Sequence, residues 1–160
     1  MENREEINKT SIEYIKGGKE LLKSIEPLWE KLNNHHIKKS IYFKEQFREL
    51  SFKERKRAME KGEEKVFFIT LARDIVIDKY IGYVIAHISK DNIGEVDSIY
   101  IEDEYRGLKI GDVFMKNSLE WIQETGGEKI TINVAFGNEE VFKFYARYGF
   151  FPRKTTLEKI

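Results

Sequence analysis

The spacing of apolar residues along the chain predicts extended and helical stretches in turn. Residues 11–16 alternate between apolar and polar positions like a short strand, and two glycines close it. From Leu21 the apolar residues recur at helical spacing, which predicts a helix with Pro27 in its first turn or at a kink. A second helical stretch ends near Gly62 and is marked by Phe43, Phe47, Leu50, Ala58 and Met59.

After this stretch the sequence becomes rich in β-branched and aromatic residues, which favour strands. The composition recurs in segments 66–72, 81–88 and 96–101. Asp78-Lys79 and Asp91-Asn92 lie between these segments and are residue pairs suited to tight turns. We therefore expect successive strands joined by hairpins.

The chain then alternates between helix and strand. A helix is predicted from Val113 to Ile122 and ends at Gly126-Gly127. Residues 129–135 follow as a strand, and a terminal strand or hairpin is expected around Pro152.

The last predicted helix begins after Asn138, which is a suitable N-cap because its side chain can accept a hydrogen bond from the first turn. Glu139 and Glu140 favour the positive end of that helix. The helix runs to Tyr148, and Gly149 fits the C′ position.

Length and composition agree with one domain. The chain has 160 residues, of which 41% are hydrophobic, and its predicted elements contain no internal repeat and no long linker. We predict a single domain over residues 1–160 of the α+β (mixed α/β) class, with residues 1–9 as a flexible tail. No segment approaches the ~18 apolar residues of a transmembrane helix, and the tail lacks the apolar part of a signal peptide. We expect a soluble, cytoplasmic protein without a membrane partner.

The chain contains no cysteine. This excludes disulfides, thiolate-bound zinc, iron–sulfur clusters and an acyl intermediate on a cysteine. The histidines lack the spacing of a metal site, because His35 and His36 are adjacent and no HxxxH or HExxH motif occurs. We expect no metal, with the adjacent pair near a helix end and His87 on a strand face.

The formal net charge is zero, but the charges are unevenly distributed. Between Lys38 and Lys61 there are nine basic and four acidic residues, so this helical region carries a net charge of +5 and the remainder carries −5. The region is either a solvated helix face with pairs such as Glu49–Lys53 or a basic rim that attracts an acidic group. Its aromatic residues are not expected to be exposed between the basic ones, and it carries no recognised motif, so we expect no nucleic-acid partner.

The segment Asp103–Asp112, with the sequence DEYRGLKIGD, carries the first chemical signal. A strand ends at Ile101, a turn containing glycine follows, and an amphipathic helix begins. Such a junction leaves backbone N–H groups unpaired at the positive end of a helix, which suits a phosphate. The segment matches neither the Walker A nor the GxGxxG pattern, and the alternative is an ordinary strand-to-helix connection.

The second signal is the segment NEEVFKFYARYGF at residues 138–150. Val141, Phe144, Tyr145 and Tyr148 fall along one face of a helix. The stripe either packs into the core, as we expect for Phe144, or lets the Tyr145 hydroxyl reach a cleft, because a buried phenol requires a partner.

Together the two segments resemble the GNAT superfamily of N-acetyltransferases. Its acyl-CoA signature, Arg/Gln-x-x-Gly-x-Gly/Ala after a strand, corresponds to Arg106-x-x-Lys109-x-Gly111, with lysine in place of the central glycine. Its downstream Asn-x-x-Ala-x-x-Phe-Tyr-x-x-x-Gly-Phe helix corresponds to residues 138–150, with Val141 in place of alanine. The resemblance is specific over residues 94–151.

The resemblance implies the GNAT fold, a central twisted and mostly antiparallel sheet flanked by helices, and acetyl-CoA as co-substrate. Residues 98–101 look like the strand that pairs with the pantetheine arm. If the loop demands a positive φ, Lys109 costs about 1 kcal/mol or more relative to glycine, although its ammonium could contact the pyrophosphate. The implied cofactor-binding residues are Ile99, Tyr100, Ile101, Arg106, Gly107, Leu108, Lys109, Ile110, Gly111, Asp112, Asn138 and Tyr145.

The resemblance also implies direct transfer of the acetyl group to a primary amine. Only about one amine in 2,500 is neutral at pH 7 when its pKa is about 10.4, so the reaction needs either a base or a lowered pKa of the amine. Tyr145 matches the family position that protonates the departing CoA thiolate. Glu95 is our candidate base, acting through water; Asp97 points to the same face of the strand, and either carboxylate is otherwise a solvent-facing or ion-paired group.

The acceptor stays open, because fold-level analogy does not transfer a substrate. We expect a small-molecule or peptide amine, and in the GNAT arrangement the basic helical region borders its groove. Analogy with the family makes a homodimer one expectation for the assembly. The alternative function is a non-catalytic acyl-CoA-binding regulatory module that keeps the cleft and lacks productive acid and base groups.

Overall fold

The computed structural model describes residues 11–160, so the tail predicted for residues 1–9 lies outside the described residues. Its single sheet has five strands in the order β1-β2-β3-β4-β5. Neighbours are antiparallel from β1 to β4, whereas β4 and β5 run parallel. The strands are β1 (Ile12–Gly17), β2 (Lys65–Asp74), β3 (Lys79–Ser89), β4 (Ile93–Ile101) and β5 (Lys129–Thr131).

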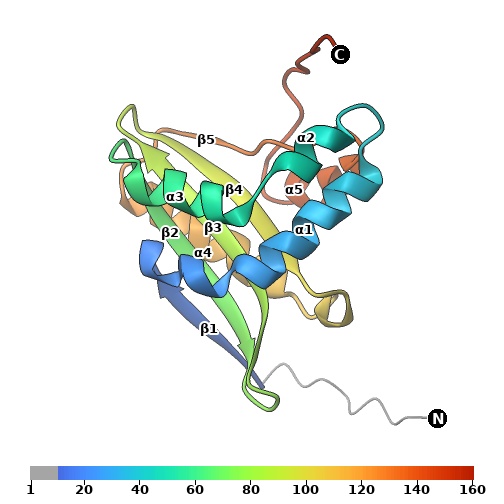
Figure 1. The fold of residues 1–160 in the computed structure, drawn as a ribbon. Coiled ribbons are helices and arrows are strands. Elements are labelled where there is room, and N and C mark those ends of the chain that lie inside the picture. The colour runs from blue at the N-terminus through green and yellow to red at the C-terminus, as the bar shows by residue number, and fades with distance from the viewer. Residues whose placement is uncertain (1–10) are drawn as a thin grey trace, which may run out of the picture.

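Helices cover both faces of the sheet, as Figure 1 shows. One face carries α1 (Glu26–Lys39), α2 (Lys44–Glu49) and α3 (Phe52–Lys61), and the opposite face carries α4 (Ile110–Glu124). The short helix α5 (Phe142–Ala146) follows β5. This is the mixed α/β single domain that the sequence predicts, and no helix among residues 11–160 has the length and apolarity needed to span a bilayer.

Each face of the sheet has its own apolar cluster, because alternate strand residues point to opposite sides. On the α1 side, Leu22, Leu28 and Phe52 pack with Ile85 and other strand residues. On the α4 side, buried helix residues meet Val84, Val96 and Tyr145. Tyr145 is therefore held by the α4 side of the core, and α5 is fixed in place through it.

The hairpins at Asp78 and Asn92 are confirmed, and both residues have positive φ. The helix predicted from Leu21 is interrupted instead: residues Lys19–Ser24 form a 3-10 helix, and α1 begins at Glu26 with Pro27 in its first turn. The second helical stretch is also broken. Ser51 has an extended backbone between α2 and α3, and its hydroxyl accepts a hydrogen bond from the Glu54 N–H at 3.1 Å. This N-cap starts a new helix and explains why a single stretch to Gly62 is wrong.

Three predictions for the C-terminal part are corrected. β5 ends at Thr131 rather than at residue 135, because only three of its residues pair with β4. The Asn138 side chain makes no capping bond; the following turn, residues 139–141, is 3-10, and α5 ends at Ala146 rather than Tyr148. The expected strand around Pro152 is absent from the described residues, where 151–160 contain no regular element.

Gly149 takes the C′ position, as predicted, and closes the turn that follows α5. Its φ is +84°, its N–H donates to the Ala146 carbonyl at 3.1 Å, and the Phe150 N–H donates to the Tyr145 carbonyl at 3.2 Å. These two bonds form a Schellman motif, which requires a left-handed residue at this position.

A β-bulge in β4 interrupts its regular pairing with β3. Ile85 pairs with Ser98 and Ala86 pairs with Val96, so Asp97 is an extra residue in the ladder. The extra residue shifts the alternation, and both Val96 and Ile99 pack on the α4 side. Asp97 and Ser98 lie between them on the α1 side, where Ser98 donates a hydrogen bond to the Tyr83 hydroxyl at 2.9 Å.

Candidate functional site

The site lies where β4 and β5 separate. Their pairing ends at Glu95 and Thr131, and beyond this point the β5-facing edge of β4 has no strand partner among the described residues. Two cavities open there. We call them the loop cleft, of about 530 Å³, and the strand cleft, of about 370 Å³. Both are lined by Leu32, Ile99, Asn138, Val141 and Tyr145.

The loop cleft takes its name from the turn between β4 and α4. In this turn Gly107 has a φ of +85° and Lys109 has a φ of +64°, and Lys109 is the N-cap residue of α4. The first backbone bond of the helix joins the Val113 N–H to the Lys109 carbonyl at 3.3 Å. Helix geometry leaves the preceding amides without carbonyl partners, and their residues line the cleft, so the start of α4 is suited to an anion.

The structure brings together all but two of the residues that the sequence predicts for the site. Leu108 is the first exception, because it packs against the α4-side core. Glu95 is the second, because it lines neither cleft. The predicted residues that line the loop cleft are Ile99, Tyr100, Ile101, Arg106, Gly107, Lys109, Ile110, Gly111, Asp112, Asn138 and Tyr145.

Three cationic side chains line the loop cleft: Arg106, Lys109 and Arg147. The guanidinium of Arg106 is fixed by a hydrogen bond from Nε to the Ile101 carbonyl at 3.1 Å and lies 5.9 Å from the centre of the Tyr100 ring. Arg147 was not predicted as a site residue. It follows Tyr145 by two positions, at the C-cap of α5, and the packing of α5 against α4 brings it to the cleft.

Asp112 joins the two helices at this point. Its carboxylate accepts hydrogen bonds from the Tyr148 hydroxyl and from Arg147, the latter at 2.7 Å. Burial and the bond to Asp112 raise the pKa of Tyr148 to about 12. A Cβ at Gly111 would lie 3.0 Å from the Phe144 ring, so this glycine lets α5 approach α4 closely.

Tyr145 lies between the two clefts and lines both. Its side chain is 8% exposed, and burial raises the pKa of its phenol to about 12. Among the described residues its hydroxyl has no hydrogen-bond partner. The phenol therefore keeps its proton at neutral pH, and the proton is available to a group bound in the clefts.

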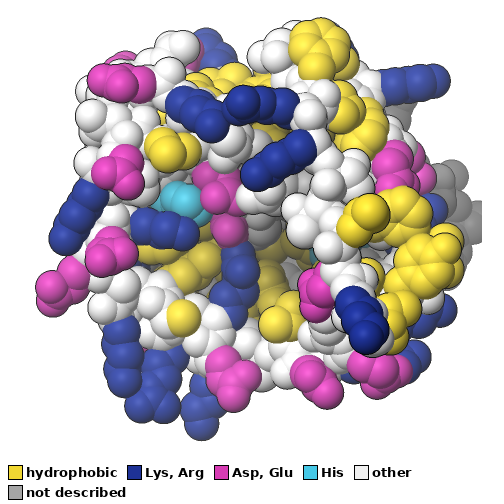
Figure 2. Space-filling model, turned by 90° about the horizontal axis from the view of Figure 1, so that it is seen from above, with side chains coloured by type: hydrophobic (Ala, Val, Ile, Leu, Met, Phe, Trp, Pro, Cys, Tyr) yellow, Lys and Arg dark blue, Asp and Glu magenta, His cyan; other side chains and the backbone are white. Residues whose placement is uncertain are grey.

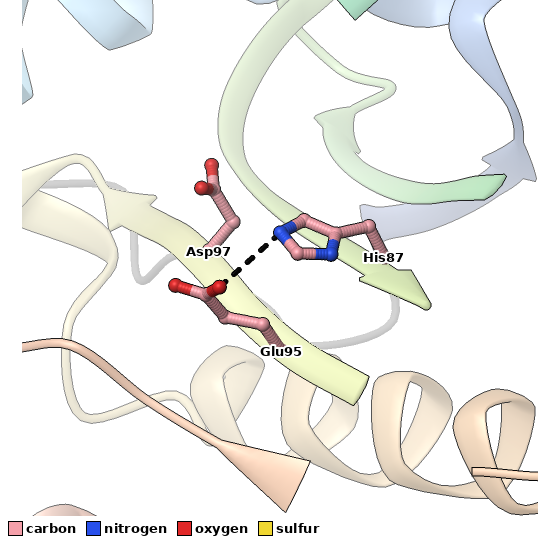
Figure 3. Close-up of side chains that lie close together, drawn as sticks. All are labelled: His87, Glu95 and Asp97. Atoms are coloured by element: carbon pink, nitrogen blue, oxygen red, sulfur yellow. Dashed lines mark ion pairs between the residues drawn. The ribbon is translucent and has the colours of Figure 1, made fainter. Parts of the chain in front are cut away.

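Figure 3 shows the carboxylate of Glu95 on β4 directed at the imidazole of His87 on β3, with Asp97 beside them on β4. His87 Nε2 lies 3.3 Å from Glu95, which also accepts a hydrogen bond from Asn133 at 2.8 Å. The contact with His87, aided by Asn133, lowers the pKa of Glu95. Glu95 is thus a weaker proton acceptor than an isolated glutamate, and it lines neither cleft.

The same three side chains place one possible ligand atom each within 4.8 Å of one another. Histidine with two carboxylates is a donor set for a divalent cation. However, the guanidinium of Arg55 in α3 forms an ion pair with Asp97, so a cation already lies against one of the carboxylates. The three residues do not fit a metal ion in this arrangement. Figure 2 shows a histidine and acidic side chains in a hollow of this face, rimmed by Lys and Arg.

Helix α1 supplies site residues that the sequence analysis missed. Leu32 and His35 line the loop cleft, and Leu32 and His36 line the strand cleft. His35 Nε2 lies 3.2 Å from the Asn138 side-chain oxygen, which replaces the capping role predicted for Asn138. The only sequence signal was the pair of histidines late in a helix, and it does not show that this helix crosses the end of the sheet.

Comparison with known proteins assigns the chain to a family. The model of the acetyltransferase (GNAT) family matches residues 19–150, and the chain belongs to this family. An uncharacterised N-acetyltransferase of Methanocaldococcus jannaschii is 27% identical over 66 residues, which span 41% of this chain and only 29% of that protein.

Solved structures agree with this assignment. A structure described as an acetyl transferase from Pyrococcus furiosus is 26% identical and has a TM-score of 0.67, with 92% of this chain and 99% of that chain covered. An aminoglycoside N-acetyltransferase in complex with CoA is 13% identical and has a TM-score of 0.64, with 93% of each chain covered. The second likeness shows the shared fold only.

Proposed function

We propose that this protein is an N-acetyltransferase that moves the acetyl group of acetyl-CoA directly onto a primary amine of an acceptor. The observation that carries the proposal is the position of Tyr145, a protonated phenol between the loop cleft and the strand cleft. Membership of the GNAT family and the likeness to a CoA-bound member support acetyl-CoA as the donor.

The loop cleft is the proposed binding site for acetyl-CoA. The amides at the start of α4 and the cations Arg106, Lys109 and Arg147 would receive the pyrophosphate, because phosphate oxygens bind both kinds of donor. The unpaired edge of β4 at Ile99–Ile101 offers backbone groups to the amides of the pantetheine arm. In this arrangement the thioester reaches the junction between the clefts, beside Tyr145.

The strand cleft is the proposed site of the acceptor amine. The neutral amine nitrogen forms a bond to the thioester carbonyl carbon and gives up a proton to a base, and the bond between that carbon and sulfur breaks. The Tyr145 hydroxyl donates its proton to the sulfur as it leaves, which avoids release of a free thiolate. The chain has no cysteine, so an acyl intermediate on a thiol of the protein is excluded.

Release of free CoA thiol from acetyl-CoA tests the proposal, with polyamines, amino acids, N-terminal peptides and aminoglycosides offered as separate acceptors. We expect thiol release that depends on at least one added amine and is strongly reduced in Tyr145→Phe. Binding of acetyl-CoA without turnover across the whole panel would contradict the proposal and favour the acyl-CoA-binding module.

A further inference from the structure

The strand cleft contains an imidazole that the function described so far does not use. His36 lies late in α1 and lines this cleft together with Asp97, Ser98 and Tyr145. Its ring stacks on Phe47 of α2, with 5.2 Å between ring centres and 23° between planes. The stacking restrains the ring, so the imidazole is held at the wall of the cleft.

The surroundings of His36 favour its neutral form. Burial lowers the pKa of the imidazole, and the neighbouring His35 on the same helix lowers it further. From β4 the cleft receives Asp97, whose charge is balanced by Arg55 of α3, and from α5 it receives the neutral phenol of Tyr145. The contact from α2 is the uncharged Phe47. His36 Nδ1 is buried and has no hydrogen-bond partner within residues 11–160.

The two carboxylates of β4 are less suited to accept a proton from an amine in this cleft. Glu95 does not line it and is occupied by His87 and Asn133. Asp97 does line it, but its carboxylate is paired with the Arg55 guanidinium. Among the described residues that line the strand cleft, His36 has a neutral imidazole that can accept a proton and that no ion pair occupies.

We propose that His36 is the general base that accepts the proton of the acceptor amine, an inference that rests on the proposed acetyl transfer. The neutral amine attacks the thioester carbonyl carbon, and as the C–N bond forms its proton passes to the imidazole. The C–S bond breaks, and Tyr145 donates its proton to the sulfur. The proton on His36 then returns to Tyr145 through solvent, so an amide and free CoA thiol are the only products.

The pH dependence of kcat/KM tests this role. Protonation of the acceptor amine alone makes log kcat/KM fall by one unit per pH unit below the pKa of the amine. A base on the enzyme adds a second proton below its own pKa, so the slope for wild type should steepen from one to two in the acidic range. For His36→Gln we expect a loss of about 10²-fold at pH 7, the lower end of general-base effects, and a slope of one throughout.

The neighbouring histidine provides a matched control. His35→Gln changes the same helix and removes the contact to Asn138, so KM for acetyl-CoA is expected to change while the steeper acidic slope remains. If His36→Gln keeps both its rate and its steeper slope, His36 is not the base. If wild type shows no amine-dependent thiol release at all, the proposed function itself fails, and the role of His36 fails with it.

Nuclear magnetic resonance of the imidazole carbons gives a readout that does not depend on activity of a variant. The chain has three histidines, so His35→Gln and His87→Gln assign the signals by subtraction. The pKa of His36 measured in wild type should lie below that of a free imidazole and should equal the pH at which the kinetic slope changes. Disagreement between the two values would overturn the proposal, even if His36→Gln fails to fold.

Discussion

The left-handed backbone of Lys109 makes a quantitative prediction about the loop that begins α4. A positive φ destabilises a residue that has a Cβ by about 1–2 kcal/mol, whereas it destabilises glycine very little. Glycine also gives the unfolded chain more freedom, which offsets about 0.4–1 kcal/mol of the gain. The free energy of unfolding of Lys109→Gly should therefore be about 0.5–1 kcal/mol higher than that of Lys109→Ala. For a chain of this length the difference corresponds to a Tm higher by about 2 °C.

The same pair of variants separates backbone strain from charge. Both lose the ammonium that lines the loop cleft, and an exposed charge contact contributes about 0.2–1 kcal/mol, so the Kd for CoA should rise about 2–5-fold in each. Chemical denaturation and calorimetric titration with CoA measure the two effects. Equal stability of the two variants would refute the strain argument, and an unchanged Kd would remove Lys109 from the pyrophosphate site.

Three further predictions concern the proton donor, the contact between α4 and α5, and the stability of the protein at acidic pH. Tyr145→Phe should lower kcat by roughly 10–1,000-fold with little change in the Kd of acetyl-CoA, because it removes the proton donor and keeps the ring; unchanged kcat when chemistry limits the rate would exclude this role. Gly111→Ala should lower the free energy of unfolding by about 1–3 kcal/mol, because its Cβ would meet the Phe144 ring at 3.0 Å. Phe144→Leu in the same chain should restore part of the loss. If the effects of the two substitutions on the free energy of unfolding simply add, the contact is contradicted. The contact with His87 lowers the pKa of Glu95. The stabilisation from this contact is therefore complete above the ordinary pKa of 4.5 and is lost as the pH falls through the lower pKa of the folded state. Glu95→Gln should consequently lose less stability on acidification than wild type, as measured by denaturation at a series of pH values.

The sequence predicted the elements whose patterns are local. The central strands, the hairpins at Asp78 and Asn92, and the cap at Gly149 each depend on residues close together in the chain, and the structure confirms them. The break at Ser51 was missed, although a serine three residues before Glu54 is a recognisable N-cap signal. The length of β5 could not be predicted, because it is set by where β4 and β5 separate.

The positions of charged and imidazole side chains were less predictable, since they depend on which elements meet. Glu95 and Asp97 share a strand face as expected, but the bulge at Asp97 and the contacts from His87 and Arg55 give the two carboxylates different surroundings. His36 looked like part of a surface helix end. It lines a cleft only because α1 crosses the sheet where the strands separate.

The destination of the acetyl group tests the central claim most directly. Wild-type protein is incubated with deuterium-labelled acetyl-CoA and an amine that supports thiol release, and mass spectrometry follows the acceptor and the intact protein. Direct transfer predicts one labelled acetyl group on the amine for every thiol released, with none left on the protein. Label recovered as free acetate or on the protein in place of the amine would contradict an N-acetyltransferase that works by direct transfer.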